Sequence, residues 1–160
     1  MLLLNKNYAQ LNSKVKNLYE LTEKDINRMH TVLLEIYDDL YKVCEKYSLK
    51  LIAGGGTLLG VIRHKGFIPW DDDMDLSMSR DDYEKFIEIF ESELGDKYEL
   101  LAPGYQKGSK VFLMRVLKKN TTLMNMIDEN SPYSNGIYID ITPIDYVPDN
   151  IILKIMLSGT

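Results

Sequence analysis

The most regular pattern in the chain is a stripe of apolar residues between Glu23 and Tyr47. Its members recur at spacings of three and four residues, as one face of an α-helix requires: Ile26, Met29, Leu33, Ile36, Tyr37, Leu40, Cys44 and Tyr47. Thr22 followed by Asp25 resembles a capping box, with Asp in place of the usual Glu or Gln. The pattern therefore predicts a long helix that packs against a core through one side.

Shorter elements follow this helix. "LKLIAGG" is typical of a short buried strand that ends in glycines, and "TLLGVIRH" is typical of a short helix that begins directly after them. In "DMDLSMS" the alternation predicts a strand with Asp73, Asp75 and Ser77 on one face and Met74, Leu76 and Met78 on the other. Ser79 and Asp82 resemble a second capping box, before a helix that carries Tyr83, Phe86, Ile87, Phe90 and Leu94.

The remaining apolar segments predict strands separated by Gly, Asn, Ser and Pro turns: "YELLA", "KVFLMRVL", "TTLMNMI" and "GIYIDIT". This order predicts an α+β fold, in which a mixed sheet is flanked by helices and a long helix lies near the N-terminus. We expect an N-terminal arm at residues 1–21 and one domain at residues 22–148. We expect residues 149–160 to begin a C-terminal region that continues in the natural protein.

Composition narrows the classes of function. A chain of 160 residues with 45% hydrophobic and 27% charged residues fits one globular domain. The net charge of -5 argues against a general nucleic-acid binder. It leaves room for an anionic substrate, because a bound metal ion can reverse the local charge. Cys44 is the single cysteine, so no intramolecular disulfide is expected. With no predicted signal peptide or membrane span, we expect a cytoplasmic protein.

The segment "GGGTLLGVIRHKGFIPWDDDMDLSMS" holds the strongest chemical signal, because aspartate fills four of the five positions 71–75. Apolar residues interleave with the acids, so part of the segment is expected to be buried. Burial of unpaired carboxylates costs several kcal/mol or more unless a positive charge compensates them. The alternative is a solvated acidic turn, which explains most runs of charge.

A metal site explains this crowding directly. Asp73 and Asp75 are two residues apart on a strand, so both carboxylates can reach one hard cation. Mg²⁺ is commonly held by one or two carboxylates together with substrate phosphates. In "GIYIDITPID", Asp140 faces away from the apolar residues Ile137, Ile139 and Ile141 and offers a third acid.

Three common motifs do not fit the glycines or the acids. A dinucleotide-binding fingerprint would need glycine at Leu59, and a P-loop would need lysine at Val61. An EF-hand loop would need glycine at Leu76 and glutamate at Asp82.

"GGTLLGVIRHKGFIPWDDDMDLSMSRDDYEKF", together with "IDITPID", resembles the signature of the LicD family, from about Ile52 to Pro148. This family belongs to the nucleotidyltransferase-fold superfamily and is related to the fukutin-type phosphoribitol transferases. The resemblance implies a nucleotidyltransferase-like sheet. It also implies transfer of a phospho-alcohol, such as phosphocholine, from a CDP-activated donor to a hydroxyl of a cell-surface glycan (lipopolysaccharide or teichoic acid). The implied cofactor is Mg²⁺ or Mn²⁺.

By position in the signature, Asp73 and Asp75 correspond to the paired metal-binding acids of the family, and Asp140 corresponds to the third. All three are implied to be catalytic. Two cations about 3.5–4 Å apart can stabilise the attacking and the leaving oxygens of a phosphoryl transfer. Asp140 is implied either to accept the proton of the acceptor hydroxyl or to act only as a metal ligand. Asp71 and Asp72 are expected to support these acids.

Six residues are expected to bind substrate: Gly55, Gly56, Thr57, Arg63, Lys65 and Trp70. The glycine turn corresponds to the motif that approaches the donor's phosphates, although the glycines could serve only to end a strand. Arg63 suits a phosphate because of its bidentate fork, whereas Lys65 could simply be solvated and His64 structural. Trp70 could stack on a base or on choline, or pack beneath the acidic turn.

The expected partners are a CDP-linked alcohol and a glycan acceptor. Neither nucleic acid nor a membrane span is expected, and any peripheral membrane contact is expected from the C-terminal region. Two other functions remain open. The chain could be a truncated or non-catalytic nucleotide-binding module, or a nucleotidyltransferase that moves the nucleotide itself.

Overall fold

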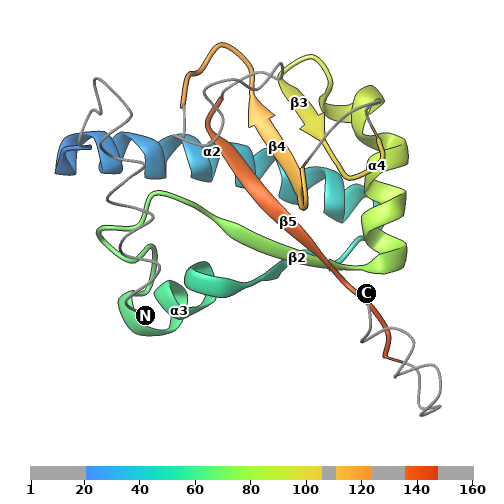
Figure 1. The fold of residues 1–160 in the computed structure, drawn as a ribbon, viewed down its shortest axis with the longest axis horizontal. Helices are drawn as coiled ribbons and strands as arrows, with labels where there is room; N and C mark the ends of the chain where they lie inside the picture. The colour runs from blue at the N-terminus through green and yellow to red at the C-terminus, as the bar shows by residue number, and fades with distance from the viewer. Residues whose placement is uncertain (1–20, 106–110, 124–135, 148–160) are drawn as a thin grey trace, which may run out of the picture.

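The computed structural model describes residues 21–105, 111–123 and 136–147 (Figure 1). Along the chain these residues form α2 (Glu23–Tyr47), β1 (Ile52–Ala53), α3 (Gly55–His64), β2 (Asp75–Ser79), α4 (Arg80–Leu94), β3 (Tyr98–Leu101), β4 (Met114–Lys118) and β5 (Tyr138–Ile144). The expected domain boundaries at residues 21 and 148 stay predictions.

The five strands form one mixed sheet in the order β1-β2-β5-β4-β3. Strands β2 and β5 pair in parallel, and the other neighbours pair antiparallel. Helices α2 and α4 both pack on the sheet and contact each other (Figure 1). The predicted α+β architecture with a long N-terminal helix is therefore confirmed.

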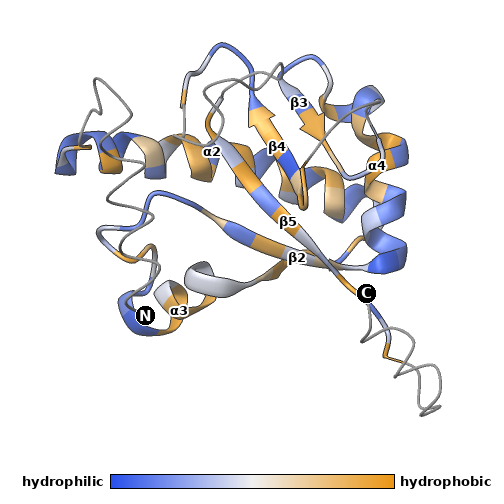
Figure 2. Cartoon of the chain, in the orientation of Figure 1, coloured by the Kyte–Doolittle hydropathy of each residue, from blue (hydrophilic) through white to orange (hydrophobic). Residues whose placement is uncertain are grey.

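The core lies between the sheet and these two helices. Alternate residues of β2, β3, β4 and β5 point into it, and Figure 2 shows the resulting change between hydrophobic and hydrophilic residues along β5. In β1, by contrast, Ile52 is exposed, so the prediction of a buried strand there is wrong. The strands and helices contribute fully or almost fully buried side chains: Leu33, Ile36, Leu40, Leu76, Met78, Phe86, Phe90, Met114, Val116, Ile139 and Ile141. Cys44 is buried as expected, and desolvation raises the pKa of its thiol to about 11.

Local capping fixes where the two long helices begin. The Thr22 hydroxyl accepts a hydrogen bond from the Asp25 amide, and the Asp25 carboxylate accepts one from the Thr22 amide, so the predicted box is confirmed. At α4 only half of the predicted box forms. The Ser79 hydroxyl accepts from the Asp82 amide, but the Asp82 carboxylate accepts from the amide of Lys50 instead.

The strand predicted for "TTLMNMI" is wrong where the structure describes it. Residues 121–123 are irregular, and the rest of that segment lies outside the described residues. The cause is local, because Asn120 has a positive φ of 61° and turns the chain at the end of β4. The Thr121 hydroxyl then donates to the Lys118 carbonyl and accepts from the Ile137 amide.

In the described part of the chain, no helix has both the length and the apolar character that crossing a bilayer requires.

Candidate functional site

Three charged residues lie in one row across the middle of the sheet. Asp75 of β2 is the register partner of Asp140 of β5, and Asp140 is the register partner of Arg115 of β4. Their sequence neighbours Leu76 and Ile141 are buried in the core. Because successive side chains of a strand alternate between faces, the row lies on the face opposite α2 and α4. The parallel pairing of β2 with β5 therefore brings together two of the predicted acids.

Arg115 was not expected in the site. Its Nε donates to Oδ1 of Asp140 at 3.0 Å, and the two side chains are only 27% and 17% exposed. The guanidinium also lies over the ring of Tyr138, 4.4 Å from its centre. The sequence contains one signal for this residue, which is a cation at an alternate position between the buried Met114 and Val116. Only the strand register shows that its partner is Asp140.

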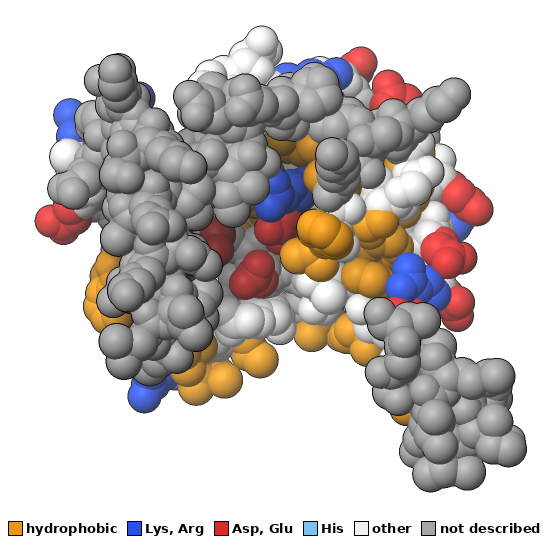
Figure 3. Space-filling model, in the orientation of Figure 1, with side chains coloured by type: hydrophobic (Ala, Val, Ile, Leu, Met, Phe, Trp, Pro, Cys, Tyr) orange, Lys and Arg blue, Asp and Glu red, His pale blue; other side chains and the backbone are white. Residues whose placement is uncertain are grey.

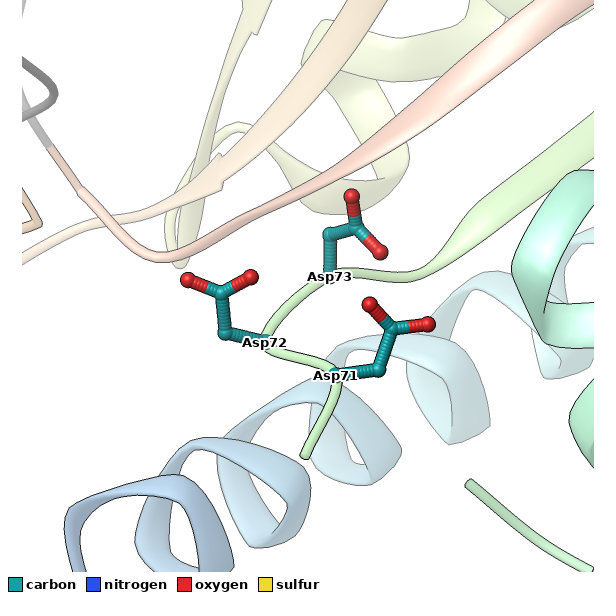
Figure 4. Close-up of side chains that lie close together, drawn as sticks. All are labelled: Asp71, Asp72 and Asp73. Atoms are coloured by element: carbon teal, nitrogen blue, oxygen red, sulfur yellow. The ribbon is translucent and has the colours of Figure 1, made fainter. Parts of the chain in front are cut away.

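A loop directly before β2 adds three more carboxylates to this face. Asp71, Asp72 and Asp73 each bring an oxygen within 4.8 Å of the other two, a spacing that could hold a metal ion (Figure 4). Asp71 and Asp72 were expected only to support the other acids, but they lie close enough to Asp73 to share a metal ion with it. Burial and the negative charges of Asp71, Asp75, Asp72 and Asp140, in that order, raise the pKa of Asp73 to about 6. The other four carboxylates therefore all act on Asp73, and the five together are called the acidic cluster.

The predicted glycine turn lies against this acidic cluster. At Gly55, whose φ is +44°, a Cβ atom would come within 2.5 Å of Oδ2 of Asp75. A Cβ atom at Gly56 would lie 2.9 Å from Oδ2 of Asp71. The hydroxyl of Thr57 accepts from the Asp75 amide at 2.8 Å. The positive φ of Gly55 favours glycine, and both glycines let the backbone at the start of α3 approach carboxylates that a Cβ atom would displace.

His30 anchors the acidic loop to α2. Its Nε2 lies 2.6 Å from the carbonyl oxygen of Asp71, so the protonated Nε2 donates this hydrogen bond. The imidazole also stacks on Phe67, with ring centres 4.0 Å apart and an interplanar angle of 3°. Sequence reasoning missed His30, because nothing around it on the helix indicates a partner in a distant loop.

Residues 48–157 match the family described as LicD/FKTN/FKRP, nucleotidyltransferase domain. The chain belongs to this family. The matched range contains the glycine turn, all five aspartates and Arg115, while His30 lies before it. The resemblance found in the sequence is therefore confirmed.

This LicD-family chain is similar to proteins of two bacteria. It is 35% identical over 130 residues to the lipopolysaccharide cholinephosphotransferase LicD of Haemophilus influenzae, covering 78% of this chain and 46% of that protein. It is 30% identical over 82 residues to an uncharacterized protein of Rickettsia typhi, covering 51% of this chain and 25% of that protein. The chain thus spans less than half the length of these relatives.

Two other substrate-binding residues expected from the LicD signature, Arg63 and Lys65, form no hydrogen bond or ion pair with the five aspartates, all of which the structure describes. Arg63 and Lys65 are exposed at the C-terminal end of α3, about 12 Å along the helix axis from the glycine turn. Nζ of Lys65 donates to the Ile62 carbonyl. The structure thus brings neither side chain to the acidic cluster, and their contact with substrate stays a prediction.

Trp70 does not pack beneath the acidic turn, so that interpretation is wrong. Its side chain is 76% exposed and meets His64 edge-on, with ring centres 6.0 Å apart. The Asp71 amide donates to the Ile68 carbonyl in a tight turn, and this turn leaves Trp70 at the surface. Stacking of Trp70 on a base or on choline stays a prediction.

A pocket of about 390 Å³ lies between α2 and α3, lined mostly by apolar side chains of these helices, β1 and β2. None of the five aspartates lines it. The acidic cluster instead belongs to the opposite face of the sheet, where Figure 3 shows acidic side chains gathered in a hollow beside a Lys or Arg side chain. The acids of the LicD signature therefore lie on this open face rather than in the apolar pocket.

Proposed function

We propose that this LicD-family chain carries the donor site for a metal-dependent transfer of phosphocholine. The donor would be CDP-choline, and the acceptor a hydroxyl of a cell-surface glycan such as lipopolysaccharide or teichoic acid. The observation that carries the proposal is the strand register that places Asp75 beside Asp140. Asp73 and the glycine turn lie next to these two acids. The activity that gives the Haemophilus relative its name supports choline and lipopolysaccharide as the first substrates to test.

Asp73, Asp75 and Asp140 would hold the cation. They offer only hard oxygen ligands, which suit Mg²⁺ or Mn²⁺. The raised pKa of Asp73 supports this fit, because it reports negative charge that the protein leaves partly uncompensated. When bound, such ions neutralise charge on the phosphates and on the leaving group.

The chain's own groups account for the rest of the proposed reaction. Backbone N–H groups at the start of α3 would hold the donor's pyrophosphate, because a helix N-terminus favours an anion. The acceptor oxygen would attack the phosphorus of the phosphocholine group and form a new P–O bond. The bond from that phosphorus to CMP would break, and CMP would leave with the electron pair. Asp140 would accept the hydroxyl proton, if it is not engaged solely as a metal ligand.

Calorimetric titration of CDP-choline, with and without Mg²⁺, tests the proposal in the wild type and in Asp75→Asn. We expect Mg²⁺-dependent binding that weakens at least tenfold in the variant, because one ligand charge is lost. Asp38→Asn removes the same charge from an exposed position on α2 and should bind like the wild type. Circular dichroism checks that both variants keep the fold.

Transfer of labelled choline phosphate to purified lipopolysaccharide then separates the candidate functions. Transfer that depends on Asp75 supports the full proposal, whereas binding without transfer supports a nucleotide-binding module. Transfer of a labelled cytidylyl group to the acceptor, with release of phosphocholine, would instead indicate a nucleotidyltransferase. Equal binding in the wild type and in Asp75→Asn would contradict a donor site at these acids.

A further inference from the structure

Arg115 places a positive charge inside an otherwise acidic surface. Its Nε contacts Oδ1 of Asp140 at 3.0 Å, and Asp140 is the register partner of Asp75. The guanidinium lies over Tyr138, two residues before Asp140 on the same strand and therefore on the same face. With Asp140 on one side and an aromatic ring beneath it, the guanidinium is held at the edge of the acidic cluster.

This position makes Arg115 a competitor of a metal ion. The guanidinium contacts Oδ1 of Asp140, so a cation bound to the same carboxylate would lie close to it, and two positive charges at one carboxylate repel each other. Because both side chains are mostly buried, solvent screens this repulsion less than at an open surface. In the absence of a divalent ion, the same contact compensates Asp140 and fixes its orientation.

The guanidinium is also well suited to a phosphate. It carries five N–H donors in a planar fork, so it can contact a carboxylate along one edge and an anion along another. Arg63 and Lys65, the cations expected for this role, lie at the far end of α3. Arg115 lies in the same row as the two acids of the proposed donor site.

We infer that Arg115 is a phosphate-binding residue of the donor site and serves as the counter-cation of Asp140 while no divalent ion is bound. The inference rests on the proposed function, because it requires a cation at Asp140 and a phosphate beside it. It has a consequence that a purely structural arginine would not have. Removal of the guanidinium should strengthen binding of the metal and weaken binding of the phosphate.

Calorimetry on Arg115→Met measures both effects, first with MgCl₂ alone and then with CDP in saturating Mg²⁺. We expect Mg²⁺ to bind several-fold more tightly, because its competitor is gone. We expect CDP to bind on the order of tenfold more weakly, the effect of one lost charge-assisted contact. Cytidine, which lacks phosphates, should bind equally to both proteins.

Two variants serve as controls. Lys118→Met removes a cation from the same strand, where Lys118 pairs with Glu35 instead, and should change neither affinity. Arg115→Lys keeps the charge but loses the fork, so it should restore the wild-type Mg²⁺ affinity and only part of the CDP affinity. If Arg115→Met does not fold, Arg115→Lys still tests the inference, because its Mg²⁺ affinity should stay unchanged while its CDP affinity falls.

The outcomes separate the two proposals. If Arg115→Met weakens Mg²⁺ binding, or leaves CDP binding unchanged, while the wild type binds both, the inference is wrong and the donor site stands. If the wild type binds no Mg²⁺, the metal-dependent function fails and the inference fails with it.

Discussion

Asp73 shows how a single carboxyl group in the site lowers the free energy of unfolding. Its pKa is raised from 3.8 to about 6, first by partial desolvation of a side chain that still reaches solvent and then by the four neighbouring aspartates. Between these two values the folded state binds more protons than the unfolded state. The free energy of unfolding therefore falls as the pH rises from about 4 to about 6, and the loss persists at neutral pH.

Asp73→Asn should remove this loss. At pH 7 and without divalent ions, we expect the variant to be more stable by on the order of 1 kcal/mol, a figure reduced for solvent screening around an exposed carboxylate. At pH 4 the two proteins should be equally stable. Urea denaturation between pH 4 and pH 7.5 in EDTA measures the difference, with Asp38→Asn as control. A variant that is less stable at pH 7 would show that the carboxylate makes a stabilising contact.

At the scale of single residues, the sequence predicted the acids but not their partners. Crowded like charges are visible in any sequence, so the acidic cluster could be predicted from composition, and its role stays a prediction. Alternation placed Asp75 correctly but was wrong for Asp73, which lies in the loop before β2. The contacts of His30 with the Asp71 carbonyl and of Arg115 with Asp140 depend on segments far apart in the chain. The sequence around His30 and around Arg115 contains no pattern from which the partner could be predicted.

Helix α3 shows how an element can be predicted while its orientation is not. The pattern "TLLGVIRH" predicted a helix, and α3 confirms it, but its buried position is Gly60 rather than an apolar side chain. A Cβ atom at Gly60 would lie 2.6 Å from the Gly66 carbonyl oxygen and 3.0 Å from the Ile68 amide nitrogen. At Gly60 the backbone of α3 therefore packs directly against the backbone of the loop that leads to the acidic cluster.

Gly60→Ala should destabilise the protein by about 1–3 kcal/mol, because the new methyl group meets backbone atoms that cannot rotate away. This cost exceeds the gain of about 1 kcal/mol in helix propensity. Mg²⁺ binding should weaken too, since the displaced loop carries Asp71. Gly66→Ala is the matched control, because its Cβ would meet nothing within 4 Å. Thermal melts and calorimetry of both variants decide, and equal stability of the two would contradict close packing at Gly60.

At the scale of elements, alternation predicted β2 and β5 as strands and placed their acids away from the core. It did not predict that these strands pair in parallel at the middle of the sheet. That pairing joins segments separated by α4, β3 and β4, and it is decided by the packing of the whole core rather than by either segment. The register of Asp75 with Asp140 therefore had to come from the structure.

For the molecule as a whole, the two faces of the sheet have opposite effects on stability. One face is covered by α2 and α4 and holds the buried core. The other gathers five aspartates in a chain whose net charge is only -5. The fold is thus stabilised on one side and loses stability on the other, where mutual repulsion favours the unfolded chain.

A divalent cation should relieve this repulsion in a way that the melting temperature of the whole domain reports. A ligand at ten times its dissociation constant adds about 1.4 kcal/mol to the free energy of unfolding. For a protein of this size that corresponds to a rise of roughly 3–6 °C. MgCl₂ should therefore raise the melting temperature beyond NaCl of equal ionic strength, which screens charge without binding in the cluster. Asp75→Asn should respond to the two salts alike. If MgCl₂ and NaCl act equally on the wild type in differential scanning calorimetry, the acidic cluster binds no specific cation.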